Sequence, residues 1–221
     1  MDNKALYSLQ YGVFLLGTKN ADGTKINACI TNTCFQTANN PVRIAISVIK
    51  QNLTCELIDQ SGEFALSVLD RSCSFETIKR FGYQSGRTVD KFADFEYETG
   101  TNGCPYIENE ACAVIEAKVC NKLDLGTHML FVAEVTDAKV LGDREALTYA
   151  YYQSDIKNQG AGGAGTGSAA GTAASGGPEK KIKGWRCKIC GYEYDGSELP
   201  SDFVCPICGH PAEDFEPIYA D

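Results

Sequence analysis

Four cysteines in the last 35 residues form two matched pairs, Cys187/Cys190 and Cys205/Cys208. Each pair has the spacing C-x2-C, fourteen residues separate the pairs, and a glycine follows the second cysteine of each. Such a glycine lets the backbone turn so that amide groups point at the sulfur atoms. Two knuckles of this kind facing each other supply four thiolates in a tetrahedron, which suits zinc or iron. The spacing predicts a metal site and leaves the metal open.

The residues around these cysteines favour iron. Five aromatic residues fall in fewer than 40 residues, namely Trp185, Tyr192, Tyr194, Phe203 and Phe215. A module this small does not fold without a metal. Cys-x-x-Cys-Gly-Tyr-x-Tyr at 187–194, Cys-Pro-x-Cys-Gly at 205–209 and the late Phe215 resemble rubredoxin. The resemblance implies one iron ion bound by the four cysteines, which would carry single electrons. The alternative is a zinc ribbon with a purely structural metal.

The sequence departs from free-standing rubredoxins in two places. The loop between the knuckles is short, and Phe203 stands where tryptophan is usual. Both features are familiar in the abbreviated rubredoxin modules that are appended to larger redox proteins.

A linker separates this module from the rest of the chain. Residues 158–178 contain 8 glycines, 6 alanines and no charge among 21 residues. A segment of this composition is predicted to be a flexible tether with a reach of roughly 25 Å. The predicted domains are 1–157, the linker 158–178 and the iron domain 179–221.

Composition limits the possible functions of the whole chain. Its 221 residues carry a net charge of −9, which disfavours nucleic acid as a partner. No apolar run approaches 18 residues and the N-terminus lacks a signal-peptide pattern, so we expect a cytoplasmic protein outside the membrane. The cysteine count of 11 is odd, which argues against a disulfide framework. The seven cysteines before residue 121 are interpreted mostly as small buried apolar residues: Cys29, Cys34, Cys55, Cys73, Cys104, Cys112 and Cys120.

The N-terminal segment is rich in short, alternating apolar stretches. Strands are predicted at 9–17, 26–36, 42–49, 63–69, 111–120 and 128–141. Helices are predicted at 52–60 and at 72–81, with Ser72 or Ser74 as the N-cap of the second. Many short strands with few helices predict a mainly β, antiparallel barrel.

Polar residues interrupt this apolar pattern at three places. Thr31-Asn32-Thr33 breaks a strand, and 47–54 runs from a strand end into a helix start, where backbone amides can hold a phosphate. Residues 80–92 gather three cations. The simpler alternatives are that Thr31 and Thr33 only favour strand structure and that the cations belong to a solvated loop.

These segments resemble the flavin reductase-like family with an FMN-binding split β-barrel. Gly126-Thr-His128-x4-Ala133-Glu134-Val135 and Leu147-Thr-Tyr-Ala-Tyr-Tyr152 share in the resemblance, which covers nearly all of 1–155. It implies a Greek-key split barrel with few short helices, FMN as cofactor and NADH or NADPH as substrate. It also implies isoalloxazine contacts from Thr31, Asn32 and Thr33, and phosphate contacts from Ser47, Lys50, Asn52, Thr54, Arg87 and Lys91. His128 would be catalytic, beside flavin and nicotinamide, although Thr127 replaces the aspartate of the family's Gly-Asp-His pattern.

The two-domain arrangement is similar to the high-molecular-weight rubredoxins of anaerobic bacteria. That similarity implies an NAD(P)H-dependent oxidoreductase and a homodimer. Its electrons would pass through FMN to iron and on to a partner such as a flavodiiron oxygen or nitric oxide reductase. Three alternatives stay open: a flavin reductase that releases reduced flavin, an electron carrier reduced by a separate reductase, and a zinc-stapled binding module.

Overall fold

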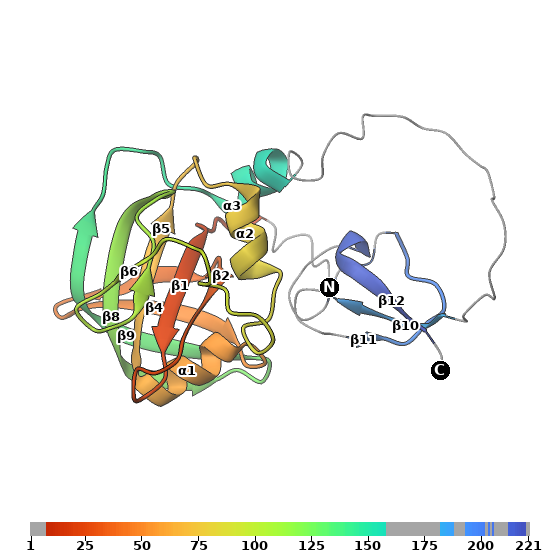
Figure 1. The fold of residues 1–221 in the computed structure, drawn as a ribbon, viewed down its shortest axis with the longest axis horizontal. Helices are drawn as coiled ribbons and strands as arrows, with labels where there is room; N and C mark the ends of the chain where they lie inside the picture. The colour runs from red at the N-terminus through yellow and green to blue at the C-terminus, as the bar shows by residue number, and fades with distance from the viewer. Residues whose placement is uncertain are drawn as a thin grey trace. The chain divides into compact units, whose positions relative to one another are not determined.

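The computed structural model describes residues 8–157, 182–187, 193–201, 203, 205 and 212–219 (Figure 1). The chain divides into two compact units between Gly160 and Ala161. The predicted linker at 158–178 lies outside the described residues, as do Cys190 and Cys208.

One antiparallel sheet of seven strands forms the N-terminal unit, in the order β2-β1-β5-β8-β9-β4-β3. Its strands are β1 (Phe14–Lys19), β2 (Ile26–Thr31), β3 (Cys34–Asn39), β4 (Val42–Ile49), β5 (Glu63–Leu69), β8 (Ala111–Asp124) and β9 (His128–Val140). A separate pair is formed by β6 (Glu98–Thr99) and β7 (Pro105–Tyr106). The predicted mainly β fold is confirmed.

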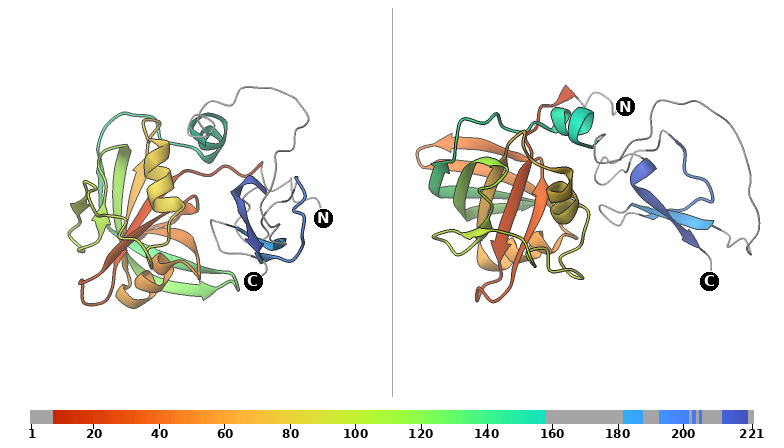
Figure 2. Two further views of the ribbon diagram at one scale, coloured as in Figure 1. Left: turned by 45° about the vertical axis from the view of Figure 1, so that its right-hand side comes forward. Right: turned by 45° about the horizontal axis from the view of Figure 1, so that its top comes forward.

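The sheet curves around its core without closing into a continuous barrel. One buried cluster joins Leu16 of β1 to Ile46 of β4 and Phe131 of β9, although β5 and β8 lie between β1 and the neighbouring strands β9 and β4 in the strand order. Figures 1 and 2 show the sheet folded over on itself accordingly. β2 and β3 are its two edges, and the pairings of the described strands do not join them.

The side chains of β1 alternate between the two faces of the sheet, and an apolar cluster covers each face. Leu16 points into the enclosed cluster, whereas its neighbour Leu15 belongs to a second cluster on the opposite face. Side chains of successive strand residues point to opposite faces, so one strand serves two cores. Ile78 of helix α2 (Phe75–Gly82) covers the second cluster.

Capping residues decide where the helices begin. The Asn52 side chain caps α1 (Leu53–Ser61), and Ser74 caps α2, so Ser74 and not Ser72 is the N-cap. Figure 1 shows α1 at one end of the curved sheet and α3 (Tyr149–Tyr151) at the other. α3 continues into a π-helical turn, Tyr152–Ile156.

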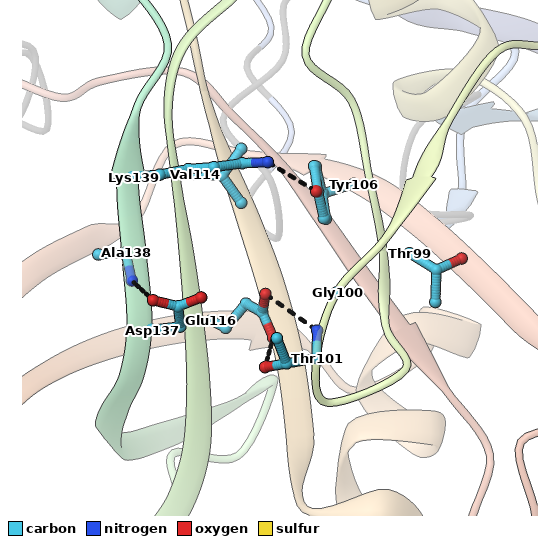
Figure 3. Close-up of a pocket in the computed structure, with 9 residues that line it drawn as sticks. All are labelled: Thr99, Gly100, Thr101, Tyr106, Val114, Glu116, Asp137, Ala138 and Lys139. Carbon is cyan, nitrogen blue, oxygen red and sulfur yellow. Dashed lines mark hydrogen bonds between the residues drawn. The ribbon is translucent and has the colours of Figure 1, made fainter.

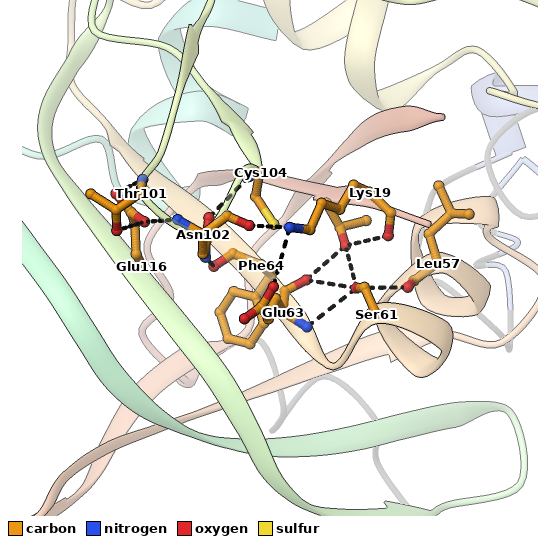
Figure 4. A network of polar contacts seen from close by, with 10 residues as sticks. Lys19, Leu57, Ser61, Glu63, Phe64, Thr101, Asn102, Cys104 and Glu116 are labelled. Carbon is orange, nitrogen blue, oxygen red and sulfur yellow. Dashed lines mark hydrogen bonds and ion pairs between the residues drawn. The ribbon is translucent and has the colours of Figure 1, made fainter. Parts of the chain in front are cut away.

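A polar network holds the C-terminal end of α1 against the sheet (Figure 4). The Ser61 hydroxyl donates to the Leu57 carbonyl at 2.9 Å, and the Thr18 hydroxyl donates to the Glu63 carbonyl at 2.8 Å. Lys19 forms an ion pair with Glu63 at 3.2 Å and also donates to the Asn102 carbonyl. These contacts fix α1, and therefore the position of its N-terminus.

Near the Thr31–Thr33 corner the predicted strand boundaries are wrong at two points. The strand predicted at 9–17 begins only at Phe14, and the one predicted at 26–36 is split into β2 and β3. The split falls at Asn32 and Thr33, which have no strand structure and form the corner between the two strands. The polar residues therefore change the direction of the chain there.

The C-terminal unit contains a three-stranded sheet in the order β11-β10-β12. Its strands are β10 (Ile182–Cys187), β11 (Glu193–Tyr194) and β12 (Phe215–Tyr219). Phe203 packs its ring between Tyr194 and Phe215, at centroid distances of 4.7 and 5.4 Å. In the part of the chain that the structure describes, no helix has the length and apolar character to cross a membrane.

Candidate functional site

The start of α1 gathers four of the residues predicted to hold a phosphate. β4 ends at Ile49 and Lys50 follows in the turn. Asn52 then takes the extended conformation of an N-cap (φ −72°, ψ 133°), and its side-chain oxygen accepts the Thr54 N–H at 3.0 Å. Ser47 lies half-buried on β4, three residues before Lys50. A helix N-terminus carries positive partial charge, which favours anions at this point.

Asn27 of β2 fixes Thr54 from the side of the sheet. Asn27 is 3% exposed, Thr54 is fully buried, and the Asn27 amide donates to the Thr54 hydroxyl at 2.9 Å. Gly86 approaches so closely that a Cβ there would stand 2.1 Å from the Asn27 Oδ1. The loop after α2 therefore lies directly against this part of β2.

The loop after α2 contains two of the predicted cations, Arg87 and Lys91, which contact different parts of the fold. The Arg87 guanidinium pairs with Glu56, in the first turn of α1, at 2.9 Å. Lys91 is 3% exposed, and its Nζ donates to the backbone carbonyls of Ala28 and Phe81 at 3.0 and 2.9 Å. Burial lowers the pKa of Lys91. Arg87 thus lies at the start of α1, while Lys91 ties β2 to α2 from inside.

Thr31, Asn32 and Thr33 form the corner between β2 and β3. The Thr31 hydroxyl accepts the Thr33 N–H at 3.3 Å, and the Thr33 hydroxyl donates to the Asn32 Oδ1 at 3.1 Å. The first residue of β3 pairs with Ile46 of β4, so Thr33 and Ser47 are the next residues along the two chains. The corner therefore borders the segment that leads into α1.

His128 opens β9 directly opposite Ile49, the last residue of β4. The Lys50 N–H donates to the Thr127 carbonyl at 3.1 Å, so the turn before β9 contacts the turn before α1. The Thr127 hydroxyl lies 2.9 Å from the His128 Nδ1. Partial burial lowers the pKa of His128, which keeps its imidazole neutral at neutral pH. The predicted catalytic residue thus lies at the same end of β4 as Lys50.

The residues from the start of α1 to the Thr31–Thr33 corner, which we call the polar path, have charged side chains at one end and uncharged polar side chains at the other. Lys50 and Arg87 supply the cations near the start of α1, and the Thr31–Thr33 corner supplies hydroxyl and amide groups. Thr31 lies four residues beyond Asn27 on β2, or roughly 13 Å along the strand. The path suits a ligand with an anionic end and a polar, uncharged end, which is the form of a flavin mononucleotide.

A cavity lies elsewhere in the N-terminal unit (Figure 3). It measures about 140 Å³ and is lined by Thr99, Gly100, Thr101, Tyr106, Val114, Glu116, Asp137, Ala138 and Lys139. The buried Glu116 carboxylate accepts the backbone N–H groups of Thr101 and Asn102 at 3.2 and 3.0 Å. Its charge is thus compensated by the protein. The residues predicted to bind flavin do not line this cavity.

Two of the four predicted metal ligands can be placed. Cys187 ends β10 and is 1% exposed, and Cys205 is 2% exposed. Two buried thiols within so small a unit fit the soft, four-sulfur donor set that iron or zinc prefers. Metal binding by all four cysteines remains a prediction, and Cys190 and Cys208 lie outside the described residues.

The other seven cysteines divide by burial. Cys29, Cys55, Cys73 and Cys104 are buried, as predicted, and burial raises the pKa of Cys55 to about 11 and that of Cys104 to about 12. Cys34 and Cys112 are half-buried and Cys120 is exposed, so the interpretation as buried apolar residues is wrong for Cys120.

Two residues of this site, Asn27 and Asp124, were not predicted from the sequence. Asn27 is a lone amide in an otherwise apolar strand, a signal that could have identified it. Asp124 pairs with Lys50 at 2.6 Å across 74 residues of sequence, and no local pattern predicts such a contact. The Lys50 ammonium and the Gly126 N–H both lower the pKa of Asp124.

Comparisons with known protein families match both units. The model of the flavin reductase like domain matches residues 6–160. The model of the rubrerythrin, rubredoxin-like domain matches residues 185–216.

Similar proteins include reductases and a rubredoxin. The chain is 37% identical to the high molecular weight rubredoxin of Moorella thermoacetica, over 99% of this chain and 100% of that protein. It is 44% identical to the ferric-chelate reductase (NAD(P)H) of Archaeoglobus fulgidus, over 69% of this chain and 89% of that protein. The solved structure of the NADH:FAD oxidoreductase SgcE6 of Streptomyces globisporus matches with a TM-score of 0.59 and 21% identity, over 65% of this chain and 84% of that one.

Proposed function

Because the chain belongs to the flavin reductase-like family and carries a rubredoxin-like domain at its C-terminus, we propose that it is an NAD(P)H-dependent electron-transfer enzyme. In this proposal electrons pass from NADH or NADPH through bound FMN to one iron ion, and from there to a redox partner. The observation that carries it is the polar path from the Thr31–Thr33 corner to the start of α1, in a chain that also holds two C-x2-C pairs.

Each residue of the path has a distinct role in the proposal. Lys50 and Arg87 neutralise the phosphate, and Asn52 and Thr54 orient it at the first turn of α1. Ser47 contacts the phosphate from β4, and Lys91 supports the site by holding β2 in place. Thr31, Asn32 and Thr33 present hydrogen-bonding groups to the flavin ring. His128, neutral at neutral pH, lies at the edge of the site as the proposed catalytic residue.

The two cofactors supply complementary chemistry. FMN takes two electrons as a hydride and returns them singly, and iron bound to four thiolates carries one electron at a time. Cys187, Cys190, Cys205 and Cys208 hold the iron in this proposal, and burial of the two placed cysteines shields the site from water.

The proposal extends to partner, assembly and location. The proposed terminal acceptor is a flavodiiron oxygen or nitric oxide reductase, as the resemblance to the high-molecular-weight rubredoxins implies. A homodimer is supported by exposed apolar side chains at Phe35, Leu123 and Leu125. A cytoplasmic location is supported by seven cysteines that the structure leaves as thiols in the N-terminal unit.

The test is the visible spectrum of the purified protein, with metal analysis, recorded before and after anaerobic NADH or NADPH. We expect flavin bands superposed on ferric-thiolate bands, with both bleached by the nucleotide. Flavin bands with zinc in place of iron would overturn the electron-transfer proposal and leave a reductase with a structural tail. Bleaching that requires a separate reductase would make the protein a carrier.

A flavin reductase that releases its product is the second candidate. The 44% identical relative is named for ferric-chelate reduction, an activity that uses a diffusible acceptor. Retention of flavin through desalting separates the two candidates, because an enzyme that releases reduced flavin loses it on the column.

A further inference from the structure

Asp124 has no role in the proposed function, although it pairs with a residue that does. It is the last residue of β8, and its carboxylate makes two contacts with different oxygens. Oδ1 accepts the Gly126 N–H at 2.8 Å, and Oδ2 lies 2.6 Å from the Lys50 Nζ. Lys50 is a cation that the proposed function assigns to the flavin phosphate. The Asp124 carboxylate therefore already binds the Lys50 ammonium, the group that the phosphate would bind.

The hairpin that carries Asp124 is fixed beside the start of α1. The Lys50 N–H donates to the Thr127 carbonyl at 3.1 Å, and the Leu125 N–H donates to the His128 carbonyl at 2.9 Å. Lys122, two residues before Asp124, forms an ion pair with Asp59 of α1. Figure 1 shows this end of the β8–β9 hairpin next to α1. Asp124 is thus held in place by the fold and does not depend on Lys50 for its position.

The ion pair itself is easy to exchange. The side chains of Lys50 and Asp124 are 40% and 55% exposed. Exposed pairs of this kind contribute little to stability, because water and salt screen them. A phosphate dianion carries more charge than a carboxylate and offers more acceptor oxygens, so it competes well for the ammonium. When Lys50 leaves, the Gly126 N–H still holds the other oxygen of Asp124.

We propose that Asp124 is a positioning residue that competes with the flavin phosphate for Lys50 and so weakens the hold on FMN. The inference rests on the proposed function, since it concerns the same phosphate site. With no flavin bound, Asp124 keeps the Lys50 ammonium close to the start of α1. With FMN bound, its negative charge stays near the phosphate and favours release. Asp124 thereby sets how readily the flavin exchanges.

The competition has a chemical signature that a structural role lacks. FMN carries the phosphate, whereas riboflavin has the same ring and ribityl chain without it. A competitor for Lys50 changes the affinity for FMN and leaves the affinity for riboflavin unchanged. Because the effect is electrostatic, it also diminishes as salt is added.

The experiment measures dissociation constants of FMN and riboflavin for the full-length chain, from flavin fluorescence quenching at low and high salt. Asp124→Asn removes the charge and keeps an oxygen that can accept the Gly126 N–H. We expect it to tighten FMN binding about fivefold at low salt, to slow FMN release, and to leave riboflavin binding unchanged. Glu134→Gln is the matched control: it removes an equal charge from the Arg43 pair, roughly 20 Å along β9 from His128, and is expected to change neither constant.

Lys50→Gln separates failure of this inference from failure of the proposed function. If Lys50→Gln leaves FMN affinity unchanged, the phosphate does not bind at Lys50, and the proposed function loses its site. If Lys50→Gln weakens FMN binding but Asp124→Asn does not strengthen it, the phosphate site stands and the competition is refuted. Equal effects of Asp124→Asn on FMN and riboflavin would also refute it, because they would show a structural role.

Discussion

At the scale of single residues, the site depends on polar groups that are buried and already paired. Asn27 of β2 and Thr54 of α1 are 27 residues apart in the sequence, and one hydrogen bond joins them. Lys91 is buried and donates to two backbone carbonyls. Pairs of this kind stabilise the fold only while both partners are present, because an unpaired buried polar group is costly.

Replacing Thr54 by valine tests this dependence. The substitution keeps the shape of the side chain but leaves the buried Asn27 amide without its acceptor. We expect a loss of about 1–3 kcal/mol in the free energy of unfolding, measured by urea denaturation. Thr54→Ser keeps the hydroxyl and is the control. A valine variant as stable as the serine variant would show that the hydrogen bond contributes nothing.

His128 provides a prediction about pH. Its pKa is lowered by burial, so the unfolded chain binds more protons than the folded one at pH values between the folded pKa and about 6.5. Stability therefore rises with pH through this window and is lost as the pH falls below about 6.5. In His128→Gln this part of the pH dependence should disappear from denaturation midpoints. An imidazole that titrates by NMR above its ordinary value would contradict the prediction.

At the scale of elements, alternation and capping predicted much of the fold. The strands at 42–49 and 63–69 have the predicted bounds, because their alternating apolar residues record the burial of one or both faces. Asn52 and Ser74 begin their helices through local hydrogen bonds, which sequence can reveal. β8 runs to residue 124, beyond its predicted end, because its exposed part is held by pairing with β9, a contact between segments that no local pattern contains.

The candidate site, like the fold, was predictable from the sequence where its residues lie close together along the chain. Ser47, Lys50, Asn52 and Thr54 fall within eight residues of sequence, so a strand end followed by a helix cap brings them together. The partners of these residues come from elsewhere: Asn27 from β2 and Asp124 from the end of β8. Packing alone brings such partners together, so composition and spacing do not identify them.

Close packing between elements makes Gly17 of β1 a sensitive position. A Cβ at Gly17 would stand 1.8 Å from the carbonyl oxygen of Pro105 in β7, and neither backbone can move without distorting its strand. Gly17→Ala should lower the free energy of unfolding by about 3 kcal/mol, seen as a shift of the urea midpoint. Gly142→Ala, with open space around the added methyl group, is the control and should change little. Equal midpoints for the two variants would contradict the argument.

At the scale of the whole molecule, the chain joins two units that bury different residues. The N-terminal unit has its own apolar clusters, and in the C-terminal unit Cys187, Cys205 and Phe215 are buried together with only a small sheet around them. A core of that size depends on a metal for its stability. We therefore expect that loss of the metal site in the C-terminal unit leaves the function of the N-terminal unit intact.

Cys205→Ser in the full-length chain tests this separation. We expect the variant to lose the native iron absorption while its flavin is still reduced by NADH or NADPH at a rate close to that of the unchanged protein. Cys120→Ser, which alters an exposed cysteine of β8, is the control and should retain both properties. Loss of both properties in Cys205→Ser would show that the N-terminal unit depends on the metal site.

The two edges of the seven-stranded sheet meet at one corner of the chain. Among the described strands, β2 pairs only with β1 and β3 only with β4, and Asn32 and Thr33 connect them. Strands held on one side can open locally while the rest of the sheet stays intact. Amide hydrogens around this corner should therefore exchange with deuterium sooner than those of β5 and β8. A flat ring bound against Thr31–Thr33 would cover the opening and slow that exchange, so the gap in the sheet would itself report whether the flavin is in place.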